Sequence, residues 1–107
     1  MNNEQQGIWD YLNENAIGYK NRKSSSEIRD ALSLESGGPT NEHVRDLIRD
    51  MIFNHGCLIG SLMFRKGYWI ISNKEELEMV KNHLNSRADG VRRRANILQQ
   101  NWDKKDE

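Results

Sequence analysis

Hydrophobic residues recur every three or four positions in three segments of the first half of the chain, which predicts three amphipathic helices. The first covers 4–15, and the second begins at Ser24, where Ser24-Ser25-Ser26-Glu27 has the spacing of a capping box. The third begins at Thr40, its expected N-cap, and ends before Gly56. The positions expected to be buried on these helices are Ile8, Tyr11, Leu12, Ile28, Ala31, Leu32, Val44, Leu47, Ile48, Met51 and Ile52.

The pattern changes after the third helix. Two short runs, 57–61 and 67–71, are rich in β-branched and aromatic residues, and a five-residue segment joins them. Two such runs at this spacing predict a β-hairpin. Arg65 and Lys66 lie at its expected tip, where they would either contact phosphates or form a solvated turn.

A heptad repeat runs through the last third of the chain and predicts one long helix over 73–102, with 103–107 as a frayed tail. Ser72-Asn73-Lys74-Glu75 resembles a second capping box at its start. Such a helix would be about 45 Å long and would project beyond the domain. We therefore expect it to pair with a second copy as a coiled coil, the alternative being a half-packed helix with a free end. The residues expected to form this homodimer interface are Leu77, Leu84, Ala88, Val91, Ala95, Leu98 and Trp102.

Helix, short helix, longer helix, hairpin and helix is the order of elements in a winged helix-turn-helix domain. The expected fold class is therefore α+β, mainly helical, with a winged-helix domain over 4–72 and the long helix over 73–102. No internal repeat and no further domain are expected from a chain of 107 residues.

Residues in the second half also carry a resemblance. Gly67-Tyr68-Trp69-Ile70-Ile71-Ser72, followed by Glu75-Glu76-Leu77-Glu78, Leu84, Arg87, Arg94 and Leu98, resembles the hairpin strand and long basic helix of small winged-helix proteins from phages and prophages. This resemblance implies a DNA-binding transcriptional regulator or a replication-associated protein. It brings no enzyme motif with it.

The charge of the chain is balanced overall but not along its length. Residues 1–56 carry six basic and nine acidic side chains, and residues 57–107 carry ten basic and seven acidic ones. Any nucleic-acid interface must therefore be local. The run Arg92-Arg93-Arg94 is interpreted as a solvated helix face, with nucleic-acid contact as the alternative.

In the DNA-binding hypothesis the third helix enters the major groove of a pseudo-palindromic duplex. Asn41 suits adenine and Arg45 suits guanine, while serines at the start of the second helix would bind a phosphate. The residues expected to contact DNA are Lys23, Ser24, Ser25, Thr40, Asn41, His43, Arg45, Arg49, Arg65 and Lys66.

A second hypothesis comes from the same third helix. Glu42, Asp46 and Asp50 are spaced by four and form an acidic side, with Phe53 beside them. Such a surface is unfavourable near phosphates. It would suit a non-enzymatic protein-binding module, for instance a phage inhibitor that docks on a basic patch of a host or defence protein.

Other function classes find no support in the sequence. His43, His55 and His83 have no metal-ligand spacing with one another or with Cys57, the single cysteine, so neither a metal site nor a disulfide is expected. No catalytic pair or phosphate-binding glycine loop is present, so we expect no enzyme activity and no cofactor. The expected location is cytoplasmic, without a membrane span or a secretion signal.

Overall fold

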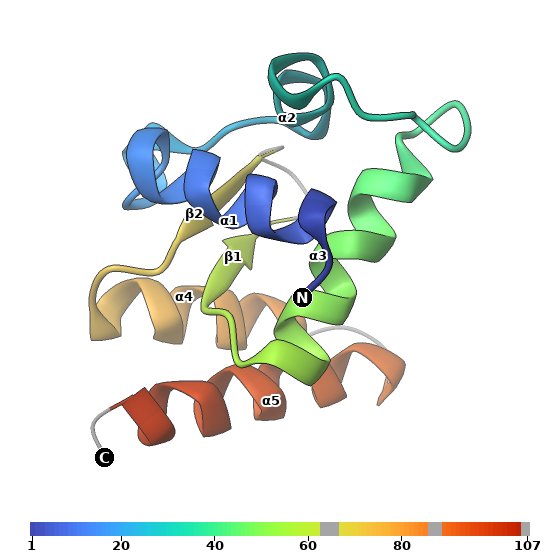
Figure 1. Cartoon of the computed structure of the whole chain (residues 1–107). Coiled ribbons are helices and arrows are strands. Elements are labelled where there is room, and N and C mark those ends of the chain that lie inside the picture. Colours follow the sequence, from blue (N-terminus) through green and yellow to red (C-terminus); the bar gives the residue numbers. More distant parts are fainter. Residues whose placement is uncertain (63–66, 86–88, 106–107) are drawn as a thin grey trace.

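Two short antiparallel strands lie at the centre of the molecule, with helices on both sides of them (Figure 1). The computed structural model describes residues 1–62, 67–85 and 89–105, and the side chains of all of these except 85 and 89–92. Strand β1 covers Ile59–Ser61 and strand β2 covers Tyr68–Ile70. The helices are α1 (Asn3–Asn15), α2 (Ser25–Leu32), α3 (Glu42–His55), α4 (Lys74–Asn85) and α5 (Asp89–Lys105). The expectation of a mainly helical α+β fold with a hairpin is confirmed.

Strand β2 is hydrogen-bonded along both of its edges. On one edge it pairs with β1, so that Ser61 lies opposite Tyr68. On the other edge it bonds to the chain between α1 and α2. There, Lys23 and Tyr68 exchange two backbone hydrogen bonds of 2.9 and 2.7 Å, and Ile70 N donates to Ala16 O at 2.7 Å. The connection between the first two helices therefore covers this edge with two isolated bridges, a parallel one at Ile17 and an antiparallel one at Lys23.

The second helix begins as its sequence predicts. Ser24 Oγ accepts a hydrogen bond from Glu27 N at 3.0 Å, and the Glu27 carboxylate accepts one from Ser24 N at the same distance. This is the expected capping box. Of the apolar positions on α2, Ile28 is buried, while Ala31 is exposed and does not belong to the core as expected.

Helix α3 begins one residue later than expected, and Thr40 is not its N-cap. Asn41 occupies that position with a left-handed backbone, φ 59°. Asparagine adopts this conformation more readily than other residues with a side chain. The expected buried face of α3 is confirmed, and Gly56 ends the helix with φ 70°.

The last third of the chain corrects the prediction of one long helix. Helices α4 and α5 run side by side in opposite directions beneath the sheet (Figure 1). Leu77 and Leu84 on α4, and Ala95 and Leu98 on α5, are at most 4% exposed and belong to the core of this same chain. These four residues present no surface to a second copy, so the expected coiled-coil interface is wrong for them.

The remaining residues of that expected interface divide into two groups. The side chains of Ala88 and Val91 lie outside the described residues. Trp102 is half-buried, and Lys105 Nζ lies 4.0 Å from the centre of its ring. Residues 103–105 continue α5 instead of forming a frayed tail. No helix in the described part of the chain, α5 included, has the length and hydrophobicity needed to cross a membrane.

Polar contacts fasten α5 to the rest of the domain. Asn101, which is 8% exposed, donates from Nδ2 to Ile52 O at 3.0 Å and to Cys57 O at 3.3 Å. Lys81 on α4 donates to the side-chain oxygen of Gln99. Because the carbonyls of Ile52 and Cys57 lie on either side of the end of α3, the Asn101 amide fixes α5 against that end.

Glu76 joins the start of α4 to the connection between α1 and α2. Its carboxylate accepts hydrogen bonds from Tyr19 N at 2.8 Å, Ser72 N at 2.9 Å and Ser72 Oγ at 3.1 Å. Partial burial alone would raise the pKa of Glu76, but these hydrogen bonds outweigh it and lower the pKa. The N-cap of α4 is Asn73, whose Oδ1 accepts from Glu76 N at 2.8 Å, so the cap lies one residue later than the Ser72 that the sequence predicts.

Replacing Glu76 with glutamine is expected to lower the free energy of unfolding at neutral pH by about 1–3 kcal/mol, because the amide accepts these hydrogen bonds more weakly. The pKa of Glu76 is lower in the folded chain than its ordinary 4.5, so its stabilising contribution is present above pH 4.5 and is lost as the pH falls through the lowered value. Urea unfolding of wild type and Glu76→Gln over this range measures the difference. Glu75→Gln, at an exposed neighbouring position, is the control. An equal loss in both variants would contradict the assignment.

Substitution by alanine is expected to have opposite effects on the stability of the fold at two glycines, Gly60 and Gly7. A Cβ on Gly60 would lie 2.7 Å from Trp69 Cζ2 and 3.1 Å from Val80 Cγ2, so Gly60→Ala forces buried side chains apart and should destabilise the fold by about 1–3 kcal/mol. A Cβ on Gly7, inside α1, meets nothing closer than 3.9 Å. Gly7→Ala should therefore stabilise by about 0.5–1 kcal/mol through helix propensity. Thermal or urea unfolding compares the two, and destabilisation by Gly7→Ala would contradict the packing described for α1.

Candidate functional site

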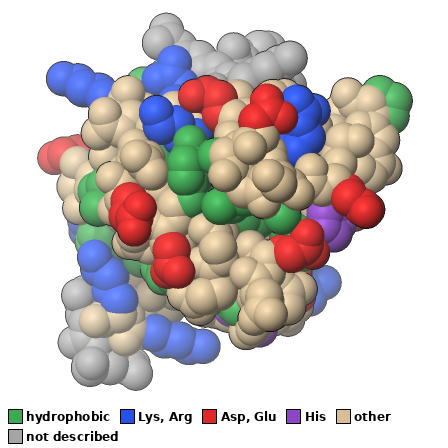
Figure 2. Space-filling view, turned by 45° about the horizontal axis from the view of Figure 1, so that its top comes forward, with side chains coloured by type: hydrophobic (Ala, Val, Ile, Leu, Met, Phe, Trp, Pro, Cys, Tyr) green, Lys and Arg blue, Asp and Glu red, His purple; other side chains and the backbone are tan. Residues whose placement is uncertain are grey.

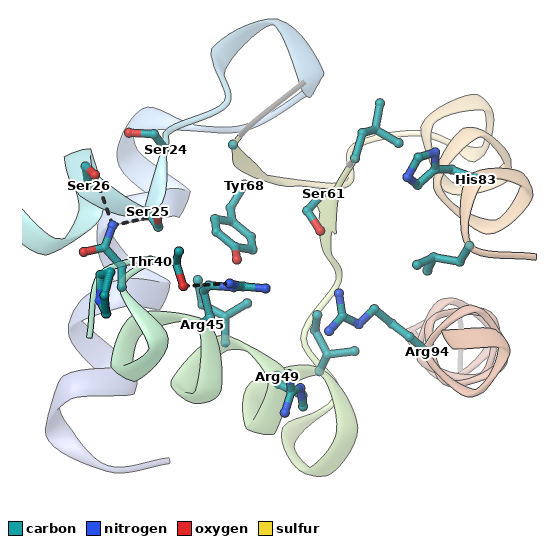
Figure 3. Close-up of a pocket in the computed structure, with 17 residues that line it drawn as sticks. Ser24, Ser25, Ser26, Thr40, Arg45, Arg49, Ser61, Tyr68, His83 and Arg94 are labelled. Carbon is teal, nitrogen blue, oxygen red and sulfur yellow. Dashed lines mark hydrogen bonds between the residues drawn. The ribbon is translucent and has the colours of Figure 1, made fainter. Parts of the chain in front are cut away.

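A groove of about 530 Å³ opens between the start of α2, the outer side of α3, the hairpin and the α4–α5 pair. Four separate parts of the chain therefore contribute its walls, and most of the side chains that reach it are polar (Figure 3). The polar and aromatic side chains lining it, apart from Asn41, are Ser24, Ser25, Ser26, Thr40, Arg45, Arg49, Ser61, Tyr68, His83 and Arg94.

The charge of the groove is positive. Arg45 and Arg49 project from α3, and Arg94 enters from α5 on the opposite wall (Figure 3). No aspartate or glutamate is among the described residues that line it, although the chain has 16 of them. The groove therefore concentrates basic side chains in a molecule whose net charge is zero.

The face formed by α1 and α2 differs from the groove in its charged residues. Helix α1 carries Glu4, Asp10 and Glu14, all exposed, and no lysine or arginine. Figure 2 shows a hydrophobic strip on this face with both acidic and basic side chains around it. The absence of basic residues is thus a property of α1 and not of the whole face.

Tyr68 lines the groove together with the three arginines. Figure 3 shows its hydroxyl pointing toward Arg45, whose Nη1 donates to Thr40 Oγ1 at 3.2 Å. Burial raises the pKa of Tyr68, and the positive charges of Arg45, Arg94 and Arg49 partly oppose that rise. Tyr68 therefore stays neutral at physiological pH and forms a polar floor beneath three cations.

Asn41 joins the start of α2 to the start of α3. Its Nδ2 donates to Ser25 Oγ at 3.0 Å and to Ser26 Oγ at 3.1 Å, and its Oδ1 accepts from Arg29 Nη1 at 2.7 Å. The side chain is buried, with 6% of the residue exposed. Asn41 thus holds the wall of the groove together, and its amide is not directed outward toward a base as the sequence analysis expected.

The other residues expected to contact DNA fall in three places. Ser24, Ser25, Thr40, Arg45 and Arg49 line the groove as a group. Lys23 and His43 do not line it. The backbone of Lys23 pairs with β2, and His43 Nε2 lies 3.1 Å from a carboxylate oxygen of Glu4. Arg65 and Lys66 lie outside the described residues.

The acidic side of α3 (Glu42, Asp46 and Asp50) is engaged within the chain. Asp50 accepts hydrogen bonds from Gln5 Nε2 at 2.7 Å and Asn54 Nδ2 at 2.6 Å, and these lower its pKa. His55 Nε2 lies 3.1 Å from the same carboxylate. Asp50 therefore anchors α1 to α3 through the buried Gln5.

The rest of this acidic side also has partners. Glu42 accepts hydrogen bonds from the hydroxyl of Thr40 at 2.7 Å and from its N–H at 3.3 Å, which lower the pKa of Glu42. Asp46 lies 3.7 Å from Arg49 Nη1. Phe53 is half-buried, with the Arg93 guanidinium 5.5 Å from its ring centre. The surface that the protein-binding hypothesis requires is thus one of mixed charge.

Sequence reasoning missed five polar or aromatic residues of the groove as contact residues. Ser26, Ser61, Tyr68 and His83 were not singled out for this surface, and Arg94 was interpreted as part of a solvated helix face. The position of Arg94 depends on α5 folding back against α3, which a heptad pattern does not reveal. A weaker signal for the groove was available in Tyr68, which places a phenolic hydroxyl next to the large Trp69 in the sequence.

Metal and thiol chemistry receive no support in the described part of the chain. No three histidine, cysteine or acidic side chains gather there in a metal-binding arrangement. Cys57 is buried, and burial raises the pKa of its thiol to about 11, which leaves it protonated and unreactive.

Comparison of the chain with protein-family models, with curated proteins and with solved structures gives no match. The resemblance to small winged-helix proteins of phages stays a prediction. Arguments about function therefore rest on the groove.

The role of Asn41 can be tested with two glycine substitutions. Asn41→Gly keeps the left-handed backbone possible but removes three hydrogen bonds, including the one from the Arg29 guanidinium, and is expected to cost about 1–3 kcal/mol of unfolding free energy. Ser33, the other described residue with a left-handed backbone and a side chain (φ 55°), is exposed. Ser33→Gly should be neutral or stabilising because it relieves that strain. Equal unfolding midpoints for wild type and Asn41→Gly would show that the hydrogen bonds do not secure the wall.

Proposed function

We propose that the chain is a non-enzymatic winged-helix protein that binds duplex DNA in the groove between α3 and the α4–α5 pair. One observation is the main support for this proposal. Guanidinium groups from two distant parts of the sequence, Arg45 and Arg49 on α3 and Arg94 on α5, converge on a groove whose described lining contains no carboxylate. Sixteen acidic residues lie elsewhere or outside the described part of the chain.

The groove offers the groups that phosphates bind. Arginine presents a planar fork of N–H donors that matches phosphate oxygens. The hydroxyls of Ser24 and Thr40, which precede α2 and α3, line the same groove. A strand of phosphates lying along the groove would meet donors from each of its walls.

The arrangement of elements supports the winged-helix part of the proposal. Strand β2 lies between β1 and the connection that follows α1, and α3 precedes the hairpin directly. A winged-helix domain needs this order, because its third helix and its hairpin must present neighbouring surfaces to DNA.

The proposal requires one copy of the chain. A dimer through Leu77, Leu84, Ala95 and Leu98 would have to open the core that these residues form. The protein-binding alternative is less well supported, since Glu42 and Asp50 are already engaged by neighbouring side chains.

Removing both arginines of α3 should weaken DNA binding. Arg45→Gln with Arg49→Gln removes two phosphate contacts, so affinity for a duplex at moderate salt should fall at least about tenfold and the slope of log affinity against log salt should shrink by about 2. Fluorescence anisotropy over a salt series measures both quantities.

The control variant is Lys104→Gln, which removes positive charge from an exposed position on α5, ten residues beyond Arg94. It should bind DNA as the wild type does. Circular dichroism checks that all variants are folded. If the double variant binds duplex DNA with unchanged affinity and salt dependence, or if the wild type binds no duplex at low salt, the proposal is wrong.

A further inference from the structure

Recognition of a base sequence requires side chains with unengaged donors and acceptors on a helix that protrudes. In helix-turn-helix proteins, residues near the start of the recognition helix contact base edges inside the major groove, which is about 12 Å wide. In this chain the corresponding residues are Asn41, Glu42 and His43, at the start of α3.

All three of these residues are engaged within the chain. Asn41 is buried, and both the oxygen and the nitrogen of its amide form hydrogen bonds. Glu42 accepts a hydrogen bond from the Thr40 hydroxyl. His43 lies 3.1 and 3.3 Å from the two carboxylate oxygens of Glu4. Directing any of them toward a base would break contacts that secure α3 to α2, to its own N-terminal loop or to α1.

The two arginines of α3, Arg45 and Arg49, also contact neighbouring side chains. Arg45 donates a hydrogen bond to Thr40, and its guanidinium lies beneath the Tyr68 hydroxyl in the groove (Figure 3). Arg49 lies 3.7 Å from Asp46, and Arg94 faces α3 from the opposite wall (Figure 3). The three guanidinium groups thus gather around the groove, whereas a recognition helix presents its side chains to base edges inside the major groove.

A hollow lined by guanidinium groups and hydroxyls is complementary to a sugar–phosphate backbone, which is a convex chain of anions. Phosphate contacts position a protein on DNA without carrying sequence information. Accepting the proposed function as a premise, we infer that this groove binds the backbone of one DNA strand and that the protein binds duplex DNA independently of base sequence.

The test uses the full-length wild-type protein and a randomised duplex library. Repeated selection on the immobilised protein should enrich no motif, and individual duplexes of unrelated sequence should bind with affinities within about threefold of one another. If three phosphates are contacted, the slope of log affinity against log salt should be about −2.7.

A second measurement separates the backbone from the bases. Duplexes in which neutral methylphosphonates replace a run of phosphates on one strand should bind at least about tenfold more weakly than the unmodified duplex of the same sequence. Transferring the neutral run to another sequence should give the same loss. Arg94→Gln should reduce the salt slope by about 1, and Lys104→Gln should leave it unchanged.

The outcomes distinguish this inference from the function on which it rests. Enrichment of a motif bound more than tenfold tighter than unrelated duplexes, or unchanged affinity for the neutralised backbone, would overturn sequence-independent backbone binding and leave DNA binding intact. Failure to bind any duplex at low salt would overturn both.

Discussion

The structure depends on a single strand, β2, that is bonded along both of its edges. One edge holds β1, and the other holds the connection between α1 and α2. Trp69 at its centre is fully buried, lies against Gly60 and meets the Tyr19 ring edge-on at 5.2 Å. Because successive side chains of a strand point to opposite faces, burying Trp69 turns Tyr68 toward the groove. The burial of Trp69 in the core therefore determines that Tyr68 lines the candidate site.

The α4–α5 pair supplies the second wall of the groove, opposite α3. Burial of Leu77 and Leu98 against the same core folds α5 back beside the end of α3, and the buried amide of Asn101 holds it there. This return brings Arg94 opposite Arg45, almost fifty residues away in the sequence. The groove exists only in the assembled domain, since neither α3 nor α5 alone has the opposing wall.

The local features of the fold could be predicted from sequence because they depend on neighbouring residues. The capping box at Ser24 and the turn at Gly56 are examples. The long helix was wrong because a heptad pattern buries Leu77 and Leu98 equally well against another copy or against the same chain. Side-chain contacts that close over long separations, such as Asn41 with Ser25, leave no periodic signal. The site was therefore predicted on α3 and α2, but its second wall was not.

Nuclear magnetic resonance of isotope-labelled full-length protein, titrated with a short duplex, tests the central claim most directly. Binding in the groove predicts that resonances of Ser25, Arg45 and Tyr68 shift together with those of Arg94, while those of the acidic helix α1, such as Asp10, stay in place. Shifts confined to α1 and the acidic side of α3, or shifts on α3 without any at Arg94, would contradict a binding site shared by the two walls.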